Sequence, residues 1–75
     1  MEKELLLKEL GRRIRTIRKS KGLSQTELGY KADKDQQSIQ RLESGNINPS
    51  YIYLYEIASG LEVGLNEFLP LPKEN

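Results

Sequence analysis

The chain has 75 residues, of which 31% are charged and 36% hydrophobic, and it contains neither cysteine nor histidine. This size predicts one small domain over residues 1–75, and the lack of cysteine excludes disulfides and thiolate metal sites. Without histidine the commonest general base and metal ligand is missing, so we expect no enzyme, no metal and no cofactor. No apolar run approaches the ~20 residues that span a bilayer, and no signal peptide is visible, so we expect a cytoplasmic protein without membrane contact.

The formal net charge is only +1, but the basic residues are unevenly distributed. Residues 12–21 contain six basic and no acidic residues, and acidic segments flank them. Such a block is compatible with one surface directed toward phosphates. An ordinary solvated helix face would give the same pattern.

The first helix is predicted over residues 4–21. Leu7, Leu10, Ile14 and Ile17 recur at the spacing of a buried helical stripe, and Gly22 is a helix stop signal. Leu5 and Leu6 widen the apolar surface, either as part of the core or as a contact with a partner; the sequence leaves both open.

Two short helices follow between Ser24 and Gly45. Ser24 is suited to cap the first, and Glu27 completes a capping box three residues later. Asp35 is suited to cap the second helix, which Gly45 ends.

The second of these helices has two different faces when its residues are placed at about 100° intervals. Ile39 and Leu42 lie on one side as an apolar anchor. Long hydrogen-bonding side chains lie on the other: Gln36, Gln37, Gln40 and Arg41. Because glutamine pairs with adenine and arginine with guanine in a bidentate manner, this face predicts contacts with DNA base edges. The alternative is an ordinary solvated face, although glutamate and lysine usually dominate such faces.

Two further helices complete the pattern. One is predicted from about Ser50 to Ser59, ended by Gly60, with Tyr51, Leu54, Ile57, Ala58 and Leu61 as its buried face. A short fifth helix is predicted over residues 64–69, and residues 70–75 form a tail that we expect to fray. The predicted fold class is therefore all-α, with five helices and a core over residues 10–69.

The middle of the chain resembles the helix-turn-helix of the lambdoid phage repressor and Cro proteins and of the wider Xre-type regulators. The residues that carry the resemblance are Leu23-Ser24-Gln25, Glu27-Leu28, Gln36-Gln37-Ser38-Ile39 and Leu42-Glu43-Ser44-Gly45. It implies a lambda-repressor-like DNA-binding domain whose motif covers about residues 24–43.

Two residues depart from the family pattern. Asp33 stands in the turn where the family commonly has glycine, and we expect strain there but no change of fold. Gly29 stands where the family usually has alanine, which weakens the helix slightly but permits a close helix approach.

The resemblance also implies roles for further residues. Arg18 would form an ion pair with Glu43, unless the two charges are solvated independently, and Gln25 would bind a phosphate and brace Gln36. Phosphate and positioning contacts would come from Gln25, Lys34, Ser38, Ser44, Asn46, Asn48, Arg15 and Lys19. For the two asparagines, turn chemistry alone is an equal alternative. A twofold dimer contact is implied at the C-terminal end, with Val63, Leu65, Phe68 and Leu69 as candidates.

These observations predict a sequence-specific regulator of transcription that binds double-stranded DNA. A homodimer would contact a near-palindromic operator whose half-site centres lie roughly 34 Å apart. A restriction–modification controller and an antitoxin are narrower forms of this prediction, with RNA polymerase or a toxin as candidate further partners. The alternative class is a helical protein–protein module without DNA binding. The low net charge and the apolar last two helices favour it, and the amide-rich face argues against it.

Overall fold

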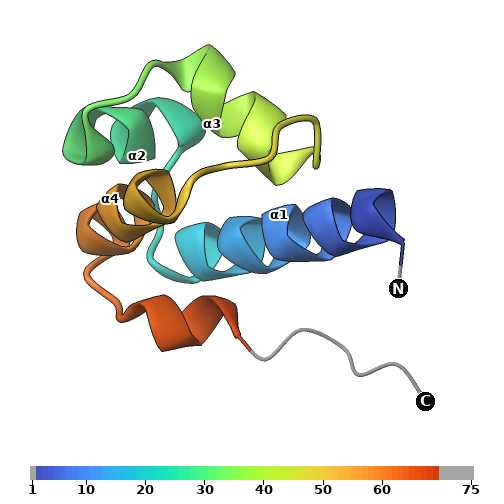
Figure 1. Ribbon diagram of the computed structural model, residues 1–75. Coiled ribbons are helices and arrows are strands. Elements are labelled where there is room, and N and C mark those ends of the chain that lie inside the picture. Colours follow the sequence, from blue (N-terminus) through green and yellow to red (C-terminus); the bar gives the residue numbers. More distant parts are fainter. Residues whose placement is uncertain (1, 70–75) are drawn as a thin grey trace.

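The computed structural model describes residues 2–69, and over this range the chain is entirely helical (Figure 1). The prediction of a frayed tail over residues 70–75 lies outside the described residues. The elements are α1 (Lys3–Ser20), α2 (Gln25–Ala32), α3 (Gln36–Glu43), α4 (Tyr51–Leu61) and a one-turn 3₁₀ helix, η1 (Leu65–Phe68). The predicted all-α class with five helical elements is therefore confirmed, although the fifth is a single tight turn.

The helix ends follow from local sequence chemistry. The predicted capping box of α2 is present: the Glu27 N–H donates to the Ser24 hydroxyl at 3.0 Å, and the Ser24 N–H donates to the Glu27 carboxylate at 2.8 Å. Gly22 and Gly45 follow α1 and α3 in the left-handed conformation, with φ of 73° and 77°. Glycine adopts this conformation without the steric cost of a β-carbon, which is why these two helices stop there.

The core lies where the inner faces of all five elements meet. Figure 1 shows α2 and α3 above α1, α4 crossing at the left, and η1 beneath α1 and α4. The buried side chains come from every element: Leu10, Ile14, Leu28, Ala32, Ile39, Leu42, Ile57, Ala58, Leu61 and Phe68. Most of them lie on the stripes that the helical periodicity predicted.

α1 and α3 pack against each other at Gly11 without an intervening side chain. A β-carbon at Gly11 would lie only 2.5 Å from the carbonyl oxygens of both Leu42 and Glu43. Such contacts are far closer than van der Waals separation, so only glycine allows α1 to approach the last turn of α3. Gly11 therefore fixes how deeply α3 sits on the rest of the domain.

Two expectations for α4 were wrong. Gly60 does not end the helix, which continues to Leu61 and ends at Glu62 in the left-handed conformation, with φ of 59°. Gly60 is buried instead, where α4 packs against α2. The packing is close, since a β-carbon at residue 60 would lie 3.1 Å from that of Ala32. Tyr51 is 70% exposed and does not join the buried face, because the first turn of α4 lies outside the core.

The C-terminal apolar residues also differ from the prediction of a dimer contact. Phe68 is only 1% exposed, because η1 folds back against α1 and α4 and inserts this ring into the core. It is therefore not available to a second subunit. Val63 and Leu65 are half-buried against the same core, whereas Leu69 remains 57% exposed.

The two departures from the family pattern meet at the turn between α2 and α3, Asp33 within it and Gly29 on the last turns of α2. Asp33 has φ of 59°, the left-handed conformation that glycine adopts more readily. A β-carbon at Gly29 would lie 2.6 Å from the carbonyl oxygen of Lys34. The close approach expected at Gly29 is therefore made by the backbone of the turn and not by another helix.

Candidate nucleic-acid interface

α3 is a two-turn helix that is closed at both ends by hydrogen bonds. At its start the Asp35 carboxylate accepts a hydrogen bond from the Ser38 N–H at 2.7 Å, and this bond lowers the pKa of Asp35. At its end the Gly45 N–H donates to the Leu42 carbonyl and the Asn46 N–H to the Arg41 carbonyl. This pair of bonds is the Schellman arrangement, which satisfies carbonyls that a helix end otherwise leaves unpaired.

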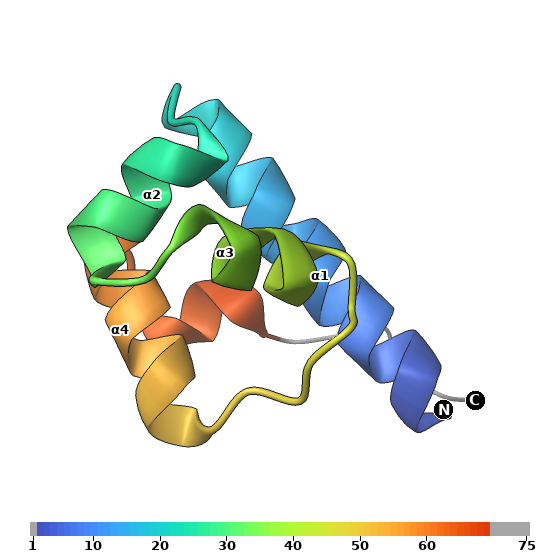
Figure 2. The same cartoon turned by 90° about the horizontal axis from the view of Figure 1, so that it is seen from above.

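The two predicted faces of α3 are present in the structure. Ile39 and Leu42 are buried in the core. On the opposite side, the four predicted base-contacting residues are all exposed: Gln36, Gln37, Gln40 and Arg41. Figure 2, viewed from above, shows α3 as the element nearest the viewer at the centre of the domain, with nothing covering it. This face of α3 is therefore open to a ligand as large as a DNA duplex.

A chain of hydrogen bonds connects α3 to α1 through α2. The Gln36 amide donates to the Gln25 amide oxygen at 2.7 Å, and the Gln25 amide donates to the Glu43 carboxylate at 3.1 Å. The guanidinium of Arg18 donates to both oxygens of Glu43, at 2.6 and 2.9 Å. The side chain of Gln36 is thus oriented by a sequence of contacts that ends in the domain interior.

The Arg18–Glu43 ion pair at the end of this chain is buried, with both side chains less than 10% exposed. Arg18 also donates to the Leu23 carbonyl at 2.7 Å. The hydrogen bonds that Arg18 donates to the Glu43 carboxylate raise the pKa of Arg18 above its ordinary value. A pair this well hydrogen-bonded holds two helices in register, whatever its net contribution to stability.

The exposed residues of α3 differ in how far they are already engaged. Gln40 donates to the Ser44 hydroxyl at 3.1 Å, and that hydroxyl donates to the Gln40 carbonyl at 2.8 Å. Gln37 and Arg41 form no side-chain hydrogen bond with any residue between 2 and 69. These two side chains can meet a ligand without first breaking a contact within the protein.

Most of the predicted phosphate-contacting residues lie at the protein surface. Arg15, Lys19, Ser44, Asn46 and Asn48 are exposed, whereas Gln25 and Ser38 are half-buried. The two asparagines lie in the loop between α3 and α4, and the two basic residues lie on α1.

Lys34 is engaged elsewhere. Its ammonium lies 2.6 Å from the Glu56 carboxylate and 4.7 Å from the centre of the Tyr53 ring, and the hydrogen bond to Glu56 raises the pKa of Lys34. It fastens the turn to α4, and its contact with a phosphate stays a prediction. Sequence reasoning missed this contact because no local signal links residues 22 positions apart.

Tyr53, beside this ion pair, carries a buried hydroxyl group that has no hydrogen-bond partner among residues 2–69. Burial raises the pKa of Tyr53, and the neighbouring Ser38 hydroxyl and Lys34 ammonium partly offset the effect. Because its ring also lies beside the Lys34 ammonium, Tyr53 connects α4 to the turn before α3.

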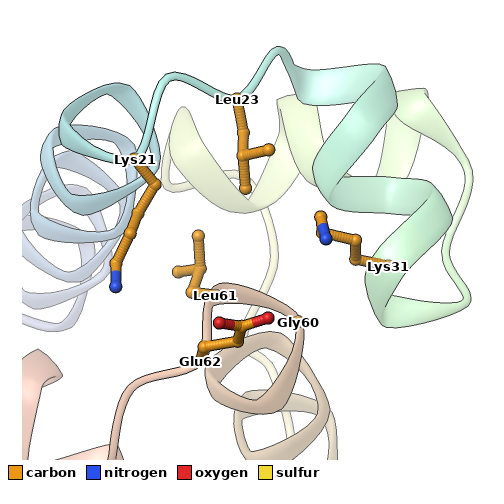
Figure 3. Close-up of a pocket in the computed structure, with 6 residues that line it drawn as sticks. All are labelled: Lys21, Leu23, Lys31, Gly60, Leu61 and Glu62. Carbon is orange, nitrogen blue, oxygen red and sulfur yellow. The ribbon is translucent and has the colours of Figure 1, made fainter.

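A hollow away from α3 has a different character (Figure 3). It is lined by Lys21, Leu23, Lys31, Gly60, Leu61 and Glu62, and the charged groups of the two lysines and of Glu62 surround it. The C-terminal ends of α1 and α4 both lie here, and helix C-termini favour nearby cations. The two lysines complement these ends, so the hollow needs no bound ion to account for its charges.

Residues 2–69 contain no cluster of three or more acidic side chains placed to hold a metal ion. Within the same range, no helix is both long and apolar enough to cross a bilayer.

Comparison with known proteins agrees with this geometry. The family model described as helix-turn-helix, HTH_3, matches residues 14–68. The chain belongs to this family. It is 39% identical over 56 residues to an HTH-type transcriptional regulator of Sinorhizobium fredii, y4dJ, in a match that covers 75% of this chain and 73% of that protein.

Solved structures of similar proteins place this helix-turn-helix protein among transcriptional regulators. The restriction-modification controller protein C.AhdI from Aeromonas hydrophila superposes with a TM-score of 0.82 at 30% identity, over 84% of this chain and 96% of that one. The wild-type restriction-modification controller C.Esp1396I gives a TM-score of 0.78 at 35% identity, over 84% and 83% of the two chains. The chain is therefore a transcriptional regulator of the DNA-binding helix-turn-helix class, as its sequence predicted.

Proposed function

We propose that this protein is a non-enzymatic, sequence-specific regulator that inserts α3 into the major groove of double-stranded DNA as a homodimer. The observation that carries the proposal is the exposed row of Gln36, Gln37, Gln40 and Arg41 opposite the buried Ile39 and Leu42. The side chains on the exposed side have the hydrogen-bonding groups that match base edges in this groove. The alternative of a helical protein–protein module requires aromatic or aliphatic anchors on such a face, and α3 has none there.

Within this proposal, Gln37 and Arg41 contact bases and the loop after α3 contacts phosphates. Base contacts carry sequence information, whereas phosphate contacts fix the register of the protein on any duplex. The substitution Gln37→Ala should therefore weaken binding to the preferred sequence and broaden base preference. Asn46→Ala should weaken binding to all sequences alike.

Selection of bound duplexes from a random pool tests this function most directly. The expected result is a near-palindromic consensus with half-site centres roughly 34 Å apart, the spacing of successive major grooves on one side of the duplex. Repeating the selection with Gln37→Ala should lose information at one or two positions of each half-site. An unchanged consensus would contradict the role of Gln37, and the absence of any consensus would contradict sequence-specific binding.

The exposed apolar residues suggest a revised surface for the proposed homodimer. Tyr51, Ile52 and Tyr55 are 56–70% exposed, and they lie within about 100° of each other around α4. Leu69 is exposed as well, whereas Phe68 is not. We therefore place the subunit contact on the first two turns of α4 and on Leu69.

The oligomeric state of a charge variant tests this surface. Ile52→Asp should shift the protein from dimer to monomer in sedimentation velocity and weaken binding to a full operator. Tyr30→Asp is the matched control, because Tyr30 is 89% exposed on α2 and outside the proposed contact. Dimers that persist in Ile52→Asp would exclude α4 as the interface.

A restriction–modification controller is the narrower function that we favour. Two solved controllers are 30–35% identical to this chain, and the match covers most of each controller's length. The operator would then lie in the control region of restriction or methyltransferase genes. An operator next to a toxin gene would instead favour the antitoxin, and contacts with RNA polymerase or a toxin remain predictions.

A further inference from the structure

The N-terminal half of α1 lies against the loop that follows α3. Both views show this loop alongside the first turns of α1 (Figure 1, Figure 2). A β-carbon at Gly45 would come within 2.8 Å of Cγ of Lys8 and within 2.9 Å of its Cα and backbone nitrogen. Lys8 thus emerges beside the segment whose asparagines are proposed to contact phosphates.

Lys8 belongs to a row of basic residues along one flank of α1. Measured around the helix from Gly11, which faces α3, Lys8, Arg15 and Lys19 lie at about 60°, 40° and 80°. All three are exposed, and none forms an ion pair with any residue that the structure describes. Arg12 lies on the same flank, but Glu9 binds its guanidinium at 2.9 Å.

The length of this row suits a nucleic-acid backbone. Lys8 and Lys19 are eleven residues apart, which corresponds to about 16 Å along a helix. One strand of B-DNA carries a phosphate about every 3.4 Å along the axis, so the row would extend past four or five phosphates. Within α1, the only acidic residue on this flank is Glu4, one turn before Lys8, and the two are not paired in the structure.

We propose that the N-terminal half of α1 is a second arm of the DNA interface, in which Lys8 contacts a phosphate next to the one held by the loop after α3. The inference rests on the proposed DNA binding and extends it to a segment outside the helix-turn-helix motif. The absence of a β-carbon at Gly45 allows α1 to approach the loop closely enough for both to contact the same strand. Because the contact is to the backbone, it strengthens binding without changing base preference.

The salt dependence of binding tests this arm. Binding of the full chain to a fluorescein-labelled duplex from the selected pool, and to a mixed-sequence duplex of the same length, is measured by anisotropy between about 50 and 200 mM salt. Lys8→Gln should reduce the slope of log K against log salt by about 1 on both duplexes, because one fewer counterion is released. Lys8→Arg should restore the wild-type slope.

Lys31→Gln is the matched control, because it removes the same charge from the hollow at the ends of α1 and α4. Its slope should equal that of the wild type, which separates a local contact from a general effect of net charge. Thermal unfolding should be unchanged in Lys8→Gln, because this side chain is exposed.

Two adverse outcomes are distinguishable. An unchanged slope in Lys8→Gln, or an equal reduction in Lys31→Gln, would overturn the second arm and leave the proposed function intact. A wild-type protein that shows no salt-dependent binding to either duplex would overturn both.

Discussion

The two ends of α3 are held in different ways. Its C-terminal end rests on α1 through Gly11 and through the buried ion pair of Glu43 with Arg18. Its N-terminal end is held by the exposed carboxylate of Asp35, which caps the helix, and by a surface hydrogen bond from the Gln36 amide to the Gln25 amide oxygen. Buried contacts with the backbone fix position strictly, whereas exposed hydrogen bonds compete with water and are worth less. The depth of α3 is therefore set at its C-terminal end and its local order at its N-terminal end.

The largest effect should come from breaking the ion pair at the C-terminal end. Glu43→Ala leaves the Arg18 guanidinium buried without its partner, which should lower the free energy of unfolding by about 3–5 kcal/mol. Urea unfolding followed by circular dichroism measures the change. The double variant Arg18→Met/Glu43→Leu should recover most of the loss, because it removes both buried charges. A small loss in Glu43→Ala would mean that this end is not held as described.

Gly11→Ala should have the next largest effect. Alanine normally stabilises a helix interior relative to glycine, but here the new methyl group would meet two carbonyl oxygens of α3 at 2.5 Å. We expect a net loss of about 1–3 kcal/mol, the usual cost of inserting a methylene into a packed interior. Gly22 has the positive φ that Gly11 lacks, and no atom lies within 4 Å of a β-carbon added there. Gly22→Ala therefore measures the cost of backbone conformation without crowding, whereas Gly11→Ala measures crowding alone. A gain in stability in Gly11→Ala would remove the distinction between the two ends.

A smaller effect, of opposite sign, is expected near the N-terminal end. Asp33 occupies a left-handed conformation that costs a residue with a β-carbon about 1–2 kcal/mol. Asp33→Gly relieves this strain but makes the unfolded chain more flexible, so we expect a net gain of about 1 kcal/mol or less. The melting temperature should rise slightly. Asp33→Val, which tolerates this conformation poorly, should lower it.

The smallest effect concerns the cap of α3 and depends on pH. The hydrogen bond from the Ser38 N–H lowers the pKa of Asp35 from its ordinary value of 3.8. The carboxylate therefore contributes its full stabilisation above pH 3.8, and this contribution is lost as the pH falls through the lowered native pKa. Asp35→Asn keeps a capping side chain that does not titrate.

Unfolding curves of wild type and Asp35→Asn between neutral pH and strong acid measure this contribution. The stability difference between the two proteins should be constant at neutral pH and should shift in favour of Asp35→Asn in acid. The cap of α2 also titrates in acid, because the hydrogen bonds with Ser24 lower the pKa of Glu27. The pH-dependent stability difference between wild type and Glu27→Gln measures that contribution separately. Parallel curves for wild type and Asp35→Asn would show that the cap does not respond to pH.

The sequence was most informative where structure depends on local chemistry. The helix caps at Ser24 and Asp35, and the two faces of α3, follow from spacing alone and are present as predicted. The pairing of Arg18 with Glu43 required the family resemblance, because no local rule joins these residues.

The predictions that were wrong depended on tertiary packing. Glycine is a common helix stop, yet Gly60 packs on Ala32 and lies inside α4. Phe68 appeared suitable for a partner because the sequence does not show that η1 folds back under the core. The ion pair of Lys34 with Glu56, 22 positions further along the chain, was not predicted at all.

The missing side chain at Gly29 decides which path the turn before α3 can take. The carbonyl oxygen of Lys34 occupies the space that an alanine methyl group at residue 29 would need. The turn can follow this path only while Asp33 adopts its left-handed conformation. The alanine-and-glycine form common in the resembling repressors therefore requires the Lys34 carbonyl to lie elsewhere than it does here. Asp33→Gly is compatible with the present path of the turn, whereas Gly29→Ala clashes with the Lys34 carbonyl as long as the turn keeps this path.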